Sequence, residues 1–187
     1  MLFQIATFLL DVVGGLLAGA CLLRLYMQLV RVSFYNPMGR FVFAVSDWLV
    51  LPLRRVVPAY RQWDLASLVA ALLVQLAEYF LLWLLSGAGA ALAWLPWMAV
   101  FGLVRVAVSG LIGLLLVYAV LSWVQTRSPM VEVLDRLCGP VLQPFRKLIP
   151  LVGGVDLAPL AALVALQVVM IVLGHLQAAV LGGSLGL

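Results

Sequence analysis

The residues that could do chemistry in this chain are few, and four of them stand inside apolar runs. Long stretches of aliphatic side chains surround Asp11, Glu78, Arg105 and His175. Ionisable groups in such runs are functional candidates, because their surroundings make charge costly. One expectation is a polar cluster in which Arg105 pairs with Glu78 or Asp11, with the histidine close by. The alternative is that the side chains stay apart and reach toward water at the edge of the apolar layer.

Metal and nucleophile chemistry find little support in the sequence. The single histidine cannot form a multi-histidine metal site. The two cysteines, Cys21 and Cys138, stand in an apolar run and a polar loop without a Cys-x-x-Cys spacing. No nucleophile motif is present. We therefore expect no metal, no cofactor and no catalytic residues, and a protein that is not an enzyme.

The composition excludes a soluble globular enzyme. The chain has 187 residues, of which 66% are hydrophobic and 10% charged, and its mean hydropathy is +1.22. Soluble domains are about 45–50% apolar and about 25% charged. These values indicate a polytopic membrane protein. The net charge of +4 comes from clustered basic residues, which on a membrane protein mark the cytoplasmic side, so no nucleic-acid partner is expected.

Four segments are long enough to cross a bilayer, which takes about 20 residues. They cover residues 3–27, 65–86, 98–124 and 157–181. The connections 28–64 and 125–156 carry most of the charge, whereas the connection between the second and third spans carries none. By the positive-inside rule, both charged loops face the cytoplasm of a bacterial inner (plasma) membrane, and both termini face outward.

The chain contains an internal repeat. A shift of 92 residues aligns 37–75 with 129–167 without a gap. Each repeat is a span, a loop and a second span, so the two repeats run parallel. We expect an all-α membrane protein of two tandem units, 1–95 and 96–187, each with an amphipathic cytoplasmic loop helix. The scarce residues that coincide include Pro37 with Pro129, Pro52 with Pro144, Arg54 with Arg146, and Asp64 with Asp156.

The two charged loops carry the most specific patterns. In the second loop, MVEVLDRL (130–137) separates charged from apolar residues as a short helix on a membrane surface does. In the first loop, a similar stripe consists of Phe41, Val45, Trp48 and Leu49.

Basic pairs follow both stripes, Arg54 with Arg55 and Arg146 with Lys147. At headgroup level each such charge gains roughly 1 kcal/mol from anionic lipid. Two interpretations stay open for the pairs. They bind the anionic headgroups of the bilayer and anchor the loops, or they form a docking surface for a cytoplasmic or membrane protein partner.

Asp64 and Asp156 each stand just before an apolar span. An aspartate there caps free backbone N–H groups and meets the positive end of the helix dipole, so both are expected to be helix caps. Small residues recur at four-residue spacing, as in Ala66 with Ala70 and Ala158 with Ala162. Such stripes allow close helix approach within one compact bundle or in a homo-oligomer.

These motifs resemble a known family. FYNP, PLRRVVP followed by WDLAS, and PFRKLIP followed by GGVDLAP are similar to the YggT family of bacterial membrane proteins, which has plastid and cyanobacterial relatives. The resemblance implies two tandem modules. It associates the chain with osmotic and envelope stress tolerance, with division or nucleoid partition, and with cytochrome b6 maturation in plastids. It implies no catalytic residues.

Two functions therefore compete. The favoured one is a non-enzymatic scaffold, assembly or envelope-stress factor that acts through its basic cytoplasmic loops. The alternative is a small channel or transporter that contributes to osmotic or cation homeostasis, which the ionisable residues within the spans would serve.

Overall fold

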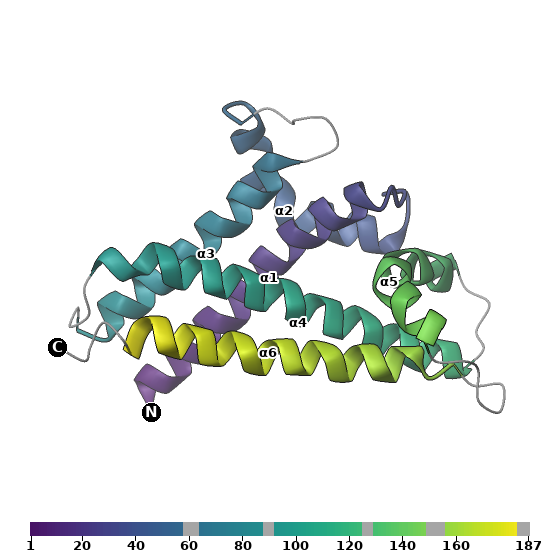
Figure 1. Ribbon diagram of the computed structural model, residues 1–187. Coiled ribbons are helices and arrows are strands. Elements are labelled where there is room, and N and C mark those ends of the chain that lie inside the picture. Colours follow the sequence, from purple (N-terminus) through teal and green to yellow (C-terminus); the bar gives the residue numbers. More distant parts are fainter. Residues whose placement is uncertain (58–63, 88–91, 125–128, 149–155, 183–187) are drawn as a thin grey trace. The chain divides into compact units, whose positions relative to one another are not determined.

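The computed structural model describes residues 1–57, 64–87, 92–124, 129–148 and 156–182, and within these ranges the chain contains no strand (Figure 1). The basic-pair motifs end at Pro58 and Pro150, which lie outside the described residues. The helices are α1 (Leu2–Leu29), α2 (Pro37–Arg54), α3 (Leu65–Leu85), the short 3-10 helix η1 (Leu92–Trp94), α4 (Leu95–Val124), α5 (Pro129–Leu148) and α6 (Ala158–Gly182).

Four of these helices, α1, α3, α4 and α6, are long and apolar enough to cross a membrane. A helix satisfies its backbone hydrogen bonds internally, which is what a hydrocarbon environment requires. The expected all-helical fold with four spans is confirmed. The third span begins earlier than expected, at Leu95 rather than residue 98. Pro96 does not break this helix because it stands in the first turn, where no intrahelical N–H is needed.

Helix α2 begins where the Asn-Pro motif places it. The side chain of Asn36 accepts a hydrogen bond from the Gly39 backbone N–H at 2.8 Å, and Pro37 occupies the first helical position. Both roles are typical of helix starts. The Asn-Pro motif of the first loop therefore has a structural role.

Helix α5 is longer than the expected segment 130–137. It covers 20 residues and continues through Pro140 and Pro144. Each proline removes one backbone donor, which leaves the carbonyl four residues earlier without an intrahelical partner. A helix that lies at a water interface can satisfy such carbonyls with solvent.

The chain forms two compact units, residues 1–107 and 108–187, with the division inside α4. In the first unit α1, α2 and α3 pack on one another, and in the second α5 packs on α6. The core of the first unit is built mostly from small residues, which lets the helices approach closely. It comprises Ala18, Cys21, Val50, Ala66, Ala70 and Ala71.

Candidate functional site

The first arginine of each basic pair binds an aspartate ten residues later in the chain. Arg54 Nη2 donates to Asp64 Oδ2, and Arg146 Nε donates to Asp156 Oδ2 at 2.9 Å. We call these two ion pairs the Arg–Asp clasps. Each joins the end of a loop helix to the start of the following span. The second members of the basic pairs, Arg55 and Lys147, are exposed.

The first clasp is fully buried on its acidic side, since Asp64 has 0% of its side chain exposed. Its carboxylate also accepts a hydrogen bond from Ser67 Oγ at 2.8 Å. Burial alone would raise the pKa of the Asp64 carboxyl, but the hydrogen bonds from Arg54 and Ser67 outweigh it and hold this pKa below its ordinary value. Asp64 stands at the N-cap position of α3, where its backbone carbonyl accepts from the Ser67 N–H at 3.0 Å.

Arg24 is a central residue of this network that the sequence analysis did not single out. Its side chain is 3% exposed and donates to Ser46 Oγ at 3.0 Å and Asp47 Oδ1 at 2.6 Å. Its Nε lies 3.7 Å from Asp64 Oδ2, and its guanidinium lies 4.7 Å from the centre of the Phe43 ring. Arg24 therefore ties α1 to α2 and to the start of α3. The available signal was an arginine placed before the end of an apolar helix.

The second clasp uses different neighbours. Arg146 Nη2 donates to the Tyr118 hydroxyl at 2.6 Å, and this hydroxyl donates to Asp135 Oδ1 at 3.0 Å. Burial alone would lower the pKa of Arg146, but its hydrogen bond to Asp156 and its contact with Tyr118 raise it. Asp156 also accepts from the Ala158 N–H at 2.9 Å, at the first residue of α6. The pair is more exposed than the first clasp, with side-chain exposures of 36% for Arg146 and 23% for Asp156.

Three of the four candidate residues within the spans share a neighbourhood in the first unit, since Asp11, Glu78 and Arg105 each interact electrostatically with Tyr79. Glu78 shares a hydrogen bond with Asp11 and accepts another from Gln75 Nε2 at 2.7 Å. Arg105 is exposed and interacts electrostatically with Tyr79. The Nδ1 atom of His175, in the second unit, lies 2.8 Å from the Ile171 carbonyl of its own helix, and its place in the cluster stays a prediction.

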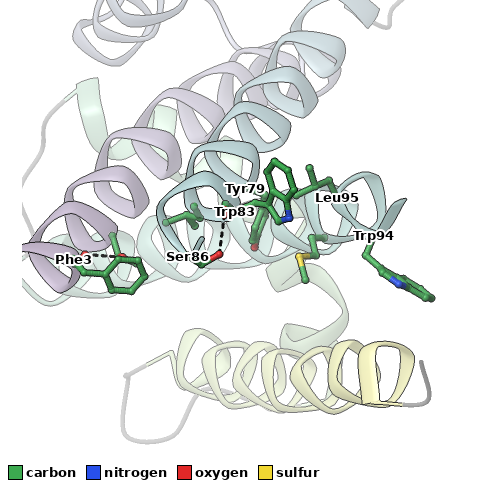
Figure 2. Close-up of a pocket in the computed structure, with 9 residues that line it drawn as sticks. Phe3, Tyr79, Trp83, Ser86, Trp94 and Leu95 are labelled. Carbon is green, nitrogen blue, oxygen red and sulfur yellow. Dashed lines mark hydrogen bonds between the residues drawn. The ribbon is translucent and has the colours of Figure 1, made fainter. Parts of the chain in front are cut away.

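A cleft of about 270 Å³ lies where the start of α1, the end of α3 and the start of α4 meet (Figure 2). Of its three hydroxyl groups, those of Thr7 and Ser86 are already bonded to carbonyls of their own helices, Phe3 and Trp83, and the third belongs to Tyr79. The cleft thus offers an apolar, aromatic surface rather than converging polar groups. Its lining residues are Phe3, Thr7, Tyr79, Leu82, Trp83, Ser86, Trp94, Leu95 and Met98.

The described residues outside the spans lack two kinds of reactive site, the side-chain grouping of a metal centre and an activated thiol. No three histidine, cysteine or acidic side chains among them are grouped as a metal site would need. Cys138 is buried, and mainly for this reason its thiol has a pKa raised to about 12. A thiol with such a pKa stays protonated near neutral pH and is a poor nucleophile.

The four apolar spans and the two clasps, each placed between a loop helix and a span, define a duplicated four-span helical membrane protein. A sequence model of the CCB3/YggT family matches residues 3–85 and 97–177, which confirms the tandem repeat. The chain belongs to this family.

Proteins of several bacteria are similar to the chain over most of its length. It is 38% identical to the protein YggT of Escherichia coli K12, over 87% of this chain and 86% of that protein. An uncharacterized protein of Pseudomonas aeruginosa is 37% identical over 92% of this chain and 90% of its own length. A protein of Vibrio alginolyticus is 31% identical, with 91% of this chain and 94% of that protein covered. No solved structure matches the chain.

Proposed function

We propose that the protein is a non-enzymatic membrane scaffold of the bacterial inner membrane, whose clasped loop helices present basic residues to anionic lipid and to a protein partner. In this arrangement both charged loops lie on the cytoplasmic side. An assembly or envelope-stress role is consistent with a protein that holds surfaces in place rather than transforming a substrate.

The repeated clasp is the observation that carries this proposal. Arg54 and Arg146 are held by Asp64 and Asp156, so each loop helix is fixed relative to the span that follows. The neighbouring cations are exposed and make no described ion pair. Such exposed charges gain little from pairing within the protein, which leaves them free to interact with headgroups or an acidic partner surface.

Co-purification from a mild detergent tests the proposal. The doubly reversed variant Arg55→Glu/Lys147→Glu should lose bound partner and anionic lipid while it keeps the thermal stability of the natural chain. The control is Arg136→Glu, which reverses an exposed cation of α5 outside the basic pairs. If the doubly reversed variant retains the same proteins and lipids as the natural chain, the basic pairs are not a binding surface.

A second candidate function is a small channel or transporter for osmotic or cation balance. The observation that favours it is the contact between Asp11 and Glu78 inside two spans, with Gln75 beside them. Carboxyl groups within a membrane commonly mark ion or proton pathways. Cation flux into liposomes should then fall in Glu78→Gln and Asp11→Asn. Flux no greater than that of empty liposomes would remove this function.

A further inference from the structure

Helix α2 has two different apolar faces. Its inner face consists of Gly39, Val42, Ser46 and Val50, which are buried against α1 and α3. At about 100° per residue, these positions share one side of the helix. A loop helix of this kind normally presents polar residues on the other side.

The opposite side of α2 is apolar instead. Phe41, Trp48 and Leu51 are 53%, 62% and 51% exposed. With Ala44, and with Arg40 and Arg55 near the two ends, they share a sector of about 100° opposite the buried side. We call this set, Arg40, Phe41, Ala44, Trp48, Leu51 and Arg55, the outer face of α2. Val45 and Leu49, expected to belong to the apolar stripe, are half-buried at its flank.

The level at which α2 packs indicates what surrounds this outer face. Val50 contacts the core formed by Ala18, Cys21, Ala66 and Ala70. These four residues lie inside the membrane spans Phe3–Leu29 and Leu65–Leu85. At 1.5 Å per residue, Ala66 and Ala70 stand within about 8 Å of the start of α3, and Ala18 stands about 16 Å from the end of α1. The end of α2 therefore packs beside the first turns of α3, at the level where this span enters the membrane.

The chemistry of the outer face suits that position. The indole N–H of Trp48 donates to the Val45 carbonyl of the same helix at 2.8 Å, so the ring can enter an apolar layer without an unpaired donor. The arginines near both ends can reach the headgroups with their flexible side chains. Tryptophan with flanking cations is the usual composition of helices at the membrane interface.

We propose that α2 is a membrane-interface helix whose outer face lies against the acyl chains of the adjacent leaflet, with Arg40 and Arg55 binding anionic headgroups at its two ends. The headgroup contacts of Arg40 and Arg55 deepen the lipid-binding part of the proposed function and rest on it. The contact of the outer face with acyl chains does not. Co-purification of a protein partner does not depend on where α2 lies, so the scaffold proposal and the membrane-interface proposal can fail separately.

Spin labels on single cysteines test the position of the outer face. In a background with Cys21→Ala and Cys138→Ala, labels at Trp48→Cys and Leu51→Cys are compared with two references in nanodiscs of phosphatidylethanolamine and phosphatidylglycerol. Val12→Cys, on exposed α1, is the lipid reference, and Tyr35→Cys, fully exposed between α1 and α2, is the water reference. Ala44→Cys repeats the measurement with a smaller side-chain change.

Labels on the outer face should be accessible to oxygen and inaccessible to a water-soluble nickel chelate, as is expected of the label at Val12. Nickel access equal to that at Tyr35 would place the face in water and overturn the proposal. Low access to both reagents would also overturn it, because a protein surface such as a second copy of the chain would then cover the face.

Bound lipid tests the two arginines. Arg40→Gln and Arg55→Gln should each lower the affinity for phosphatidylglycerol about fivefold, equivalent to roughly 1 kcal/mol, as measured by native mass spectrometry. Arg105→Gln, which removes an exposed cation from α4, is the matched control. Unchanged phosphatidylglycerol binding in both α2 variants would overturn the headgroup contacts.

Discussion

Arg146 Nε lies 2.9 Å from Asp156 Oδ2, and this pair repeats the contact between Arg54 and Asp64 in the first half of the chain. In both halves the two residues are ten positions apart and join a loop helix to the next span. The neighbours differ, because Arg24 and Ser67 surround the first pair and Tyr118 and Asp135 the second. The same contact is therefore held in two different electrostatic environments.

The two clasps should differ in their contribution to stability. Asp64→Asn leaves Arg24 and Arg54 beside a buried neutral amide and should lower the free energy of unfolding by about 3 kcal/mol. Asp156→Asn removes a partly exposed pair and should cost less than about 1 kcal/mol. Denaturant titrations in a fixed detergent measure both values. Equal losses of unfolding free energy in the two variants would contradict the prediction that the more buried clasp contributes more.

The first clasp should also make stability depend on pH. The pKa of Asp64 is lowered in the folded protein, whereas an aspartate in the unfolded chain titrates near about 3.9. The stabilisation from the Asp64 carboxylate is therefore complete above the unfolded-state pKa. It is lost as the pH falls through the lower pKa of the folded protein. The difference in unfolding free energy between the natural chain and Asp64→Asn should shrink from pH 5 toward pH 2. A difference independent of pH would contradict this prediction.

Gly39 should not tolerate a side chain. A Cβ atom there would lie 2.4 Å from the Phe34 carbonyl oxygen, a backbone atom that cannot move without changing the turn before α2. Gly39→Ala should destabilise the protein by roughly 1–3 kcal/mol. Gly139→Ala in α5 is the control, since a Cβ there meets nothing within 4 Å, and it should add about 0.5–1 kcal/mol of helix stability. Thermal unfolding of the two variants should shift in opposite directions.

Gly14 provides the space for the Glu78 carboxyl group between α1 and α3. A Cβ on Gly14 would lie 2.0 Å from Glu78 Oε2, whereas one on Gly15 meets nothing within 4 Å. Gly14→Ala should therefore destabilise the helix pair, and Gly15→Ala should not. Because the clash is with one side chain, Glu78→Ala should largely remove the cost of Gly14→Ala in a double-mutant cycle. Additive effects would show that the two residues are not coupled.

Several local features could be predicted because their causes are local. Asn36 and Pro37 start α2, since an asparagine cap followed by proline satisfies the first turn wherever the helix packs. The effect of a proline on a helix is not local in this way. Pro96 lies in the first turn of α4, and α5 continues through Pro140 and Pro144. Whether a proline ends a helix depends on what else can satisfy the freed carbonyl.

The sequence by itself determined the membrane class, the four spans and the duplication, because each follows from composition and spacing along the chain. Only the tertiary structure decided the partner of each charge. Arg54 is held by Asp64 while Arg55 is exposed, although the two are adjacent. Arg24 is buried in contact with α2 and with Asp64 at the start of α3. Ion pairing depends on which side chains the packed helices bring within about 4 Å, and neither helical periodicity nor hydropathy encodes that distance.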